Sequence, residues 1–122
     1  MTIIQNDPAI RTSTGTAWVR ICSYTDLLPE RGAAALVAGH QIAIFRTFDG
    51  RLFAVGNRDP FSGAYVISRG IVGTRGDEPV VAAPMHKQPF SLTTGVCLDD
   101  PSTALATYPI RVAGGMVEVS VA

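Results

Sequence analysis

A chain of 122 residues has the length of one domain, and folding at this size buries roughly two-thirds of the surface that the unfolded chain exposes. Hydrophobic residues make up 47% of the chain and charged residues only 16%, which predicts a packed core and excludes a disordered protein. Ten basic and ten acidic residues cancel, and no basic stripe with interleaved aromatics occurs, so nucleic acid is not the expected partner.

The chain also lacks membrane and export signals. No apolar run approaches the roughly 18 residues that cross a bilayer. Residues 1–7 carry neither the basic segment nor the apolar stretch of a secretory signal. We therefore expect a soluble, cytoplasmic protein.

Residues 1–16 show no hydrophobic period, and we expect them to form a flexible tail in front of a single domain over residues 17–122. The alternation in residues 17–22 predicts the first strand. Thr25 ahead of Pro29 predicts a helical turn at most.

Short strands separated by turn signals fill the rest of the chain. The predicted strands are 34–38 and 41–47 joined at Gly39-His40, 51–56 after Asp49-Gly50, 80–83 and 89–92 around a tip at 85–88, and 106–112 and 116–121 joined at Gly114-Gly115. Segments 66–67 and 71–72 are either short strands or covering loops. No segment has a helical period, so the sequence predicts an all-β barrel or sandwich.

Two proline-bearing turns stand out, each at the end of a hydrophobic strand. The first reads Asn-Arg-Asp-Pro-Phe-Ser-Gly (residues 57–63), and the second reads Ala-Pro-Met-His-Lys-Gln-Pro-Phe-Ser-Leu-Thr-Thr-Gly (residues 83–95). In this order, with hairpins before them and a closing hairpin after them, the chain resembles a Rieske-type domain over residues 18–121. The resemblance implies an antiparallel Rieske-like barrel or sandwich, with an inserted two-loop subdomain over about residues 57–95.

Cluster-bearing Rieske domains supply Cys-x-His from the first turn and Cys-x-x-His from the second, and these four side chains hold a [2Fe-2S] cluster. Alignment on the prolines places Asp59, Phe61, Ala83 and His86 at the four ligand positions. Only His86 matches the family. Phe61 and Ala83 have no donor atom, and Asp59 offers hard oxygen where soft sulfur is required, so we expect no cluster and no metal on this chain.

Within the Rieske-like proteins, the chain resembles the small subunits of cytoplasmic NAD(P)H-dependent nitrite reductases. The resemblance rests on Trp-Val-Arg-Ile-Cys (18–22), Asp-Leu-Leu-Pro (26–29), Asn-Arg-Asp-Pro (57–60), Pro-Met-His-Lys-Gln (84–88) and Phe-Ser-Leu (90–92). It implies a partner, the large subunit, which carries FAD, a [4Fe-4S] cluster and sirohaem and reduces nitrite to ammonium in nitrate assimilation. It implies an accessory, non-catalytic role for this chain, with no independent activity.

Two interpretations of the loop residues remain open. Asp59, with Arg58, either pairs with Lys87 and bridges the two turns in place of the cluster, or it caps its own turn. His86 either caps its turn through a backbone hydrogen bond, which we favour, or binds another metal or donates a proton.

The two turns also carry candidate docking residues, because this end of a Rieske domain faces redox partners. Arg58, Phe61, Met85, Lys87 and Gln88 form the expected patch, in which an aromatic ring and a thioether serve as anchors. We expect Phe61 to point inward, into the space of the lost cluster, and Met85 to point outward.

Two other functions are weighed against the accessory subunit. A Rieske-type ferredoxin of an oxygenase would need a cluster, and a small metal-dependent enzyme would have to use His86 and Asp59. The two cysteines lie far apart in sequence and predict no disulfide. Cys22 is expected to be buried and Cys97 to be the more accessible thiol.

Overall fold

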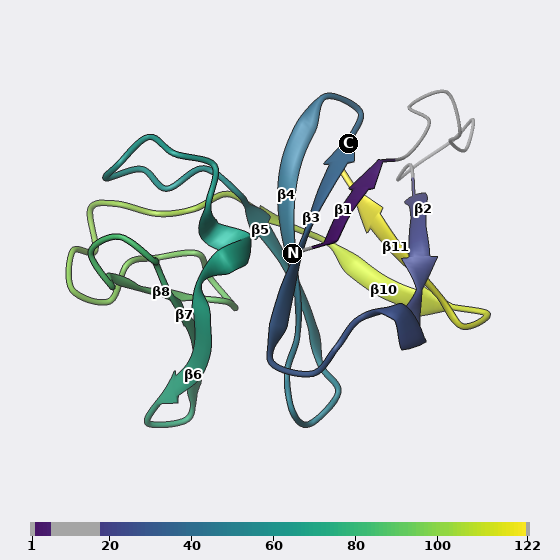
Figure 1. The fold of residues 1–122 in the computed structure, drawn as a ribbon. Coiled ribbons are helices and arrows are strands. Elements are labelled where there is room, and N and C mark those ends of the chain that lie inside the picture. Colours follow the sequence, from purple (N-terminus) through teal and green to yellow (C-terminus); the bar gives the residue numbers. More distant parts are fainter. Residues whose placement is uncertain (1, 6–17, 122) are drawn as a thin grey trace.

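A computed structural model of the chain describes residues 2–5 and 18–121, which form an all-β fold of three sheets (Figure 1). The strands are β1 (Thr2–Gln5), β2 (Trp18–Ser23), β3 (Arg31–Val37), β4 (His40–Arg46), β5 (Leu52–Gly56), β6 (Ile71–Arg75), β7 (Glu78–Ala82), β8 (Pro89–Ser91), β9 (Thr107–Tyr108), β10 (Ile110–Ala113) and β11 (Met116–Ser120). Two short 3-10 helices, η1 (Tyr24–Asp26) and η2 (Ile67–Arg69), connect them. The predicted fold class and helical turn are confirmed, and so are the predicted strands except for 106–112. Of the two segments left open, 71–72 lies in a strand, β6, and 66–67 leads into η2.

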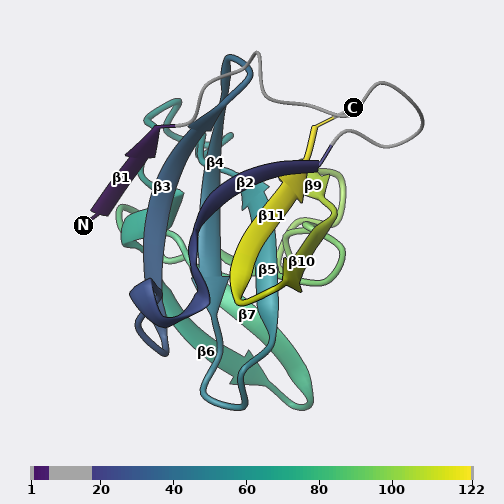
Figure 2. The same cartoon turned by 90° about the vertical axis from the view of Figure 1, so that its right-hand side faces the viewer.

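Two of the sheets make the barrel. One has the strand order β1-β3-β4-β5-β9 and the other has the order β10-β11-β2 (Figure 2). The first core lies between them, and its buried members include Val37, Ile42, Ile44, Val117 and Val119. Those on β4 and β11 occupy every second position, as side chains on one face of a strand do, and their neighbours Ala43, Phe45 and Glu118 are buried on the opposite face.

The turns differ in detail from their predicted positions. The β3–β4 hairpin turns at Ala38-Gly39, one residue earlier than predicted, so that Val37 pairs with His40. Ala38 and Gly39 have φ angles of 49° and 83°, which is the left-handed pair that a tight two-residue hairpin requires. The predicted strand over 106–112 is divided at Pro109 into β9 and β10, which belong to different sheets.

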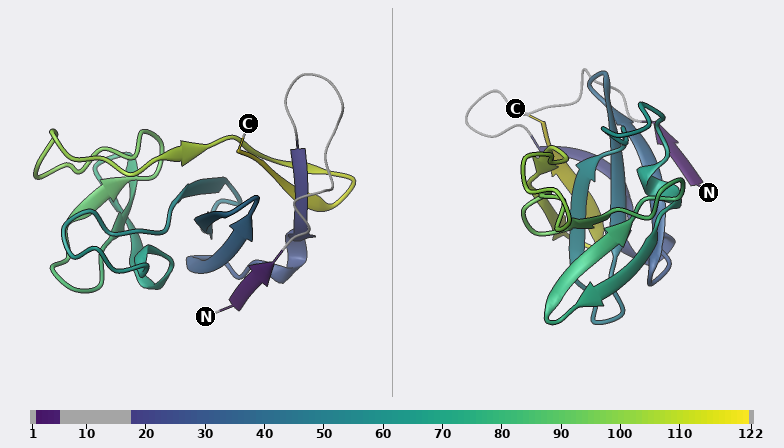
Figure 3. Two further views of the ribbon diagram at one scale, coloured as in Figure 1. Left: turned by 90° about the horizontal axis from the view of Figure 1, so that it is seen from above. Right: turned by 90° about the vertical axis from the view of Figure 1, so that its left-hand side faces the viewer.

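The third sheet, β6-β7-β8, forms a subdomain on one side of the barrel (Figures 1 and 3). It has its own core, in which Phe45 and Val55 from the barrel sheet pack with Val81, Phe90 and Leu92. The two cores therefore share strands β4 and β5, whose opposite faces supply residues to each of them.

The junction between barrel and subdomain is tight at Gly32. A Cβ atom at this glycine would lie 2.2 Å from the backbone oxygen of Ser68 and 2.7 Å from Cε1 of Phe45. Only glycine allows η2 to lie this close to β3.

Sequence analysis assigned no element to residues 1–16. The structure adds β1, which pairs in parallel with β3, in the register Thr2 to Ala33. The remainder of the expected tail, and Ala122, lie outside the described residues. No helix in the described part of the chain is long and apolar enough to cross a membrane.

Both cysteines are free thiols, but the expected order of exposure is wrong. Cys97 is fully buried and pairs through its backbone with Phe90, whereas Cys22 is partly exposed on β2. The Thr-Thr-Gly turn ahead of Cys97 directs its side chain into the subdomain core.

Candidate functional site

The two proline-bearing turns form neighbouring loops at the subdomain. We call residues 57–66, between β5 and η2, the first loop, and residues 83–88, between β7 and β8, the second loop. The first loop follows β5 of the barrel and the second follows β7 of the subdomain (Figure 1). Both strands contribute buried residues to the subdomain core. The positions of the loops therefore follow from the hydrophobic strands that precede them.

Asn57 fastens the first loop at both of its ends. Its buried side chain donates from Nδ2 to the backbone oxygen of Tyr65 (3.2 Å) and accepts at Oδ1 from the backbone N–H of Ser68 (2.8 Å). The backbone oxygen of Asn57 also accepts from the N–H of Ile67. This role of Asn57 was not predicted from the sequence, although an asparagine directly after a buried strand is a signal for such side-chain to backbone bonding.

Asp59 closes the turn inside the first loop. Its Oδ1 accepts from the backbone N–H of Phe61 (2.9 Å), and its backbone oxygen accepts from the N–H of Gly63 (2.7 Å). The residue is fully buried, and Oδ2 has no hydrogen-bond partner in the described structure. Asp59 therefore caps its own turn, and it makes no ion pair with Lys87 among the residues described. Of the two interpretations of Asp59, the local cap is the one observed.

The second loop is held by its backbone. The N–H of Ala83 donates to the oxygen of Gln88, and the N–H of Lys87 donates to the oxygen of Ala83. Lys87 has a φ angle of 58°, a left-handed conformation that costs a non-glycine residue energy. His86 is exposed and forms no hydrogen bond within the described part of the chain, so the expected cap by its imidazole is absent.

An aromatic contact connects the first loop to β8. The rings of Phe61 and Phe90 are 6.0 Å apart between centroids and tilted by 46°. Phe61 remains 38% exposed, so one part of its ring packs inward and another part reaches the surface. Met85 is 58% exposed and points away from the core, as expected.

The four cluster-ligand positions divide into an inner and an outer pair. Asp59 and Ala83, where cluster-bearing domains have cysteine, are buried at 0% and 1% exposure. Phe61 and His86, where they have histidine, reach the surface. The inner positions offer a hard carboxylate, one of whose oxygens is bonded to the turn, and one methyl group in place of two thiolates, so these residues do not fit a [2Fe-2S] cluster. Among the described residues, no group of three histidine, cysteine, aspartate or glutamate side chains could hold a metal ion.

The outer surface of the two loops combines apolar and cationic side chains. Phe61, Met85 and the neighbouring Tyr65 (52% exposed) are its apolar members, and Arg58 and Lys87 are its exposed cations. The only acidic residue on either loop is the buried Asp59. Gln88 is half-buried, with its Oε1 enclosed, and contributes little to this surface. Sequence analysis did not select Tyr65, whose position two residues after Gly63 gave no local signal.

In the described part of the chain, three side chains outside the two loops have displaced pKa values. A hydrogen bond from Thr47 holds the pKa of Asp49 below its ordinary value, and hydrogen bonds from Ser102 and Thr103 lower the pKa of Asp100. Burial raises the pKa of the Cys22 thiol, and the charge of Asp26 adds to this increase.

Comparison with known proteins gives a consistent assignment. The model of the family described as "Rieske-like [2Fe-2S] domain" matches residues 17–120. The nitrite reductase (NADH) small subunit of Salmonella typhimurium is 41% identical over 103 residues, which cover 84% of this chain and 95% of that protein. A crystal structure from Mycobacterium tuberculosis, solved as a candidate NADH-dependent nitrite reductase small subunit, superposes with a TM-score of 0.86 at 47% identity, covering 89% of this chain and 98% of that one.

A third relative has a different organisation. The nitrite reductase [NAD(P)H] large subunit of Klebsiella oxytoca is 35% identical over 115 residues, which are 94% of this chain but only 12% of that protein. That large subunit therefore contains a segment similar to most of this chain.

Proposed function

The chain belongs to the Rieske-like [2Fe-2S] domain family and, within it, to the nitrite reductase (NADH) small subunits, and from this membership we propose that it is the accessory small subunit of an NAD(P)H-dependent nitrite reductase. The observation that carries the proposal is the match to such small subunits over nearly the full length of both chains. The protein acts in the cytoplasm, as a non-catalytic part of an oxidoreductase that converts nitrite to ammonium.

The partner is the large subunit. The Klebsiella oxytoca relative supports this choice, because a domain held in the same polypeptide as the large subunit works next to it. FAD, a [4Fe-4S] cluster and sirohaem on the large subunit supply the electron-transfer chemistry, and this chain supplies binding and orientation.

The donor atoms at the two loops argue against the rival functions. A Rieske-type ferredoxin needs four soft or imidazole ligands, and the four ligand positions of the two loops offer one imidazole, at His86. A metal-dependent enzyme built on His86 and Asp59 would have to join an exposed imidazole to a fully buried carboxylate, and no third ligand stands with them among the described residues.

The outer surface of the two loops is the proposed docking face. Exposed apolar side chains rimmed by polar ones are typical of protein interfaces, and aromatic and methionine side chains serve there as anchors. Phe61 and Met85 are the anchors, and Arg58 and Lys87 form a cationic rim that has no surface acid on either loop to neutralise it. An acidic surface on the large subunit would complement this face.

The proposal is tested by reconstitution. The large subunit is purified with and without this chain, and co-elution and nitrite-dependent NADH oxidation are measured for both preparations. We expect a stable complex whose turnover or lifetime exceeds that of the large subunit alone. Failure of the untagged chains to associate at micromolar concentrations would reject the proposal.

A further inference from the structure

Strand β6 is an open edge of the subdomain sheet. The sheet has the order β6-β7-β8, and β6 pairs with β7 alone. The opposite edge, β8, is covered, because Leu98 donates to the oxygen of Pro89 and Ser91 donates to the oxygen of Val96. An uncovered edge strand is a template for pairing with another extended chain.

The position of Pro79 on β7 indicates which backbone N–H and C=O groups of β6 point away from β7, toward the open edge. Pro79 lies opposite Thr74 in the ladder, and it has no N–H to donate. Because antiparallel pairs alternate between bonded and non-bonded, Gly73, paired with Val80, bonds to β7, whereas Thr74 directs its N–H and C=O away from β7.

The same alternation turns Val72 outward, two residues before Thr74. No backbone hydrogen bond from another segment reaches Val72 or Thr74 in the described residues. The edge therefore presents two donors and two acceptors in the spacing of a β-ladder.

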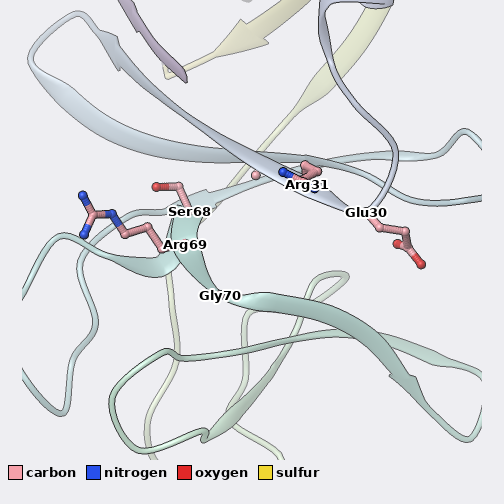
Figure 4. A pocket seen from close by; sticks show the side chains of 6 residues that line it. Glu30, Arg31, Ser68, Arg69 and Gly70 are labelled. Carbon is pink, nitrogen blue, oxygen red and sulfur yellow. The ribbon is translucent and has the colours of Figure 1, made fainter. Parts of the chain in front are cut away.

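A hollow of about 400 Å³ opens where β6 begins. It lies between the start of β3 and the segment from η2 to Gly70, and it is lined by Glu30, Arg31, Gly32, Ser68, Arg69 and Gly70 (Figure 4). Arg31 and Arg69 are exposed and have no ion-pair partner among the described residues. Ile71, which follows Gly70 and is the first residue of β6, is 70% exposed.

We propose that the open edge of β6 receives an extended segment of the large subunit, which adds a fourth strand to the subdomain sheet and places an acidic side chain at the hollow beside Arg31 and Arg69. This inference rests on the proposed function for the identity of the partner, and it concerns a second contact, separate from the two loops. Main-chain bonds to Val72 and Thr74 provide affinity, and the arginines favour an acidic, apolar segment over other extended chains.

A second copy of this chain is the competing occupant of the edge. An antiparallel pair of β6 strands centred on Val72 places Arg69 of one copy opposite Arg75 of the other, which destabilises that register, whereas a pair centred on Gly73 places Arg69 opposite Asp77. The choice of the large subunit over a second copy therefore rests on the cations Arg31 and Arg69, unpaired among the described residues, which favour an acidic segment.

Thr74→Pro tests the edge, with Thr74→Val as its matched control. Proline at this position removes only an N–H that faces away from β7, and edge strands tolerate proline with this orientation. Valine keeps the N–H and the β-branched shape. We expect Thr74→Pro to weaken binding of the large subunit about tenfold and Thr74→Val to bind as the wild type does. Equal binding by all three would overturn the edge contact and leave the proposed function intact.

Hydrogen exchange gives a measurement that does not depend on folding of a variant. In the complex with unlabelled large subunit, the amides of Val72 and Thr74 are expected to exchange at least about tenfold more slowly than in the free chain, whereas the amide of Gly73, already bonded to β7, changes little. Unchanged exchange at Val72 and Thr74 in a formed complex would refute the proposal. The proposal would also be refuted if the isolated wild-type chain formed dimers and the Thr74→Pro variant did not, because the edge would then bind a second copy of this chain.

Discussion

The carboxylate of Asp59 accepts a hydrogen bond from the backbone N–H of Phe61, at 2.9 Å, from a position that is fully buried. The relationship explains how a loop shaped for a cluster keeps its form with no cluster ligand in place. A thiolate bonded to iron is replaced by a carboxylate bonded to the loop itself, so the loop is closed from within.

Replacement of Asp59 by alanine should therefore destabilise the protein. We expect Asp59→Ala to lower the free energy of unfolding by about 1–2 kcal/mol, because the N–H of Phe61 loses its partner. Asp59→Asn is the control, since it keeps an oxygen acceptor for the N–H of Phe61, and it should retain most of the stability. Urea denaturation measures both, and equal losses in the two variants would mean that the cap is not what stabilises the loop.

Asp59 and Lys87 should behave as independent residues. Asp59 is enclosed, Lys87 is exposed, and no ion pair joins them among the residues described. In a double-mutant cycle, the effects of Asp59→Ala and Lys87→Ala on stability should add within about 0.5 kcal/mol. A coupling energy well above this value would restore the bridge between the loops that the sequence also allowed.

The strands and turns could be predicted from the sequence where a few adjacent residues determine them. Period-2 alternation and glycine-bearing turns predicted most strands of the three sheets, apart from β1 and β6, because each depends on a few adjacent residues. The β3–β4 turn was displaced by one residue because Ala38 adopts a left-handed φ angle that alanine rarely takes. The break at Pro109 followed from the missing N–H of proline, a signal present in the sequence but not used.

Burial of side chains in the loops was harder to predict, because it depends on segments far away in the chain. Cys97 is enclosed by the subdomain core, and Asn57 bonds across eleven residues to Ser68. The spacing around these residues does not reveal such contacts. The open edge of β6 likewise follows from the order of the strands in space, which the sequence left undecided.

Gly32 provides a test of the junction between barrel and subdomain. Gly32→Ala should destabilise the protein by about 1–3 kcal/mol, because the new methyl group meets the backbone oxygen of Ser68. A backbone atom cannot rotate aside as the end of a flexible side chain can. Gly73→Ala is the matched control in another strand. Its Cβ would meet nothing within 4 Å, and its effect should stay within about 0.5 kcal/mol. Thermal unfolding of the two variants under one buffer compares them, and a Gly32→Ala protein as stable as the wild type would contradict the close approach of η2 to β3.

The cysteines should differ in reactivity toward iodoacetamide. In the native protein only Cys22 is expected to react, because Cys97 is fully buried, and both should react in denaturant. The raised pKa of Cys22 keeps it in the neutral thiol form at pH values where a free cysteine, with a pKa of about 8.5, already forms thiolate. Its alkylation rate should therefore rise at a higher pH than that of a free cysteine. Asp26→Asn should move this rise to lower pH by removing one cause of the shift, and a rise at or below the pH of a free cysteine would contradict the assignment.

The docking face predicts a contrast between variants of similar exposure. Met85→Asp and Lys87→Glu should each weaken binding of the large subunit about tenfold or more, because one places a charge on an apolar anchor and the other reverses the cationic rim. Val112→Asp is the control, since Val112 is 46% exposed on β10, outside both loops. Titration of the large subunit with each variant at low and at high salt gives the affinities, and the defect of Lys87→Glu should shrink as salt screens the charges. Binding of Met85→Asp and Lys87→Glu with the affinity of Val112→Asp would move the interface away from the two loops and leave the edge of β6 as its remaining candidate.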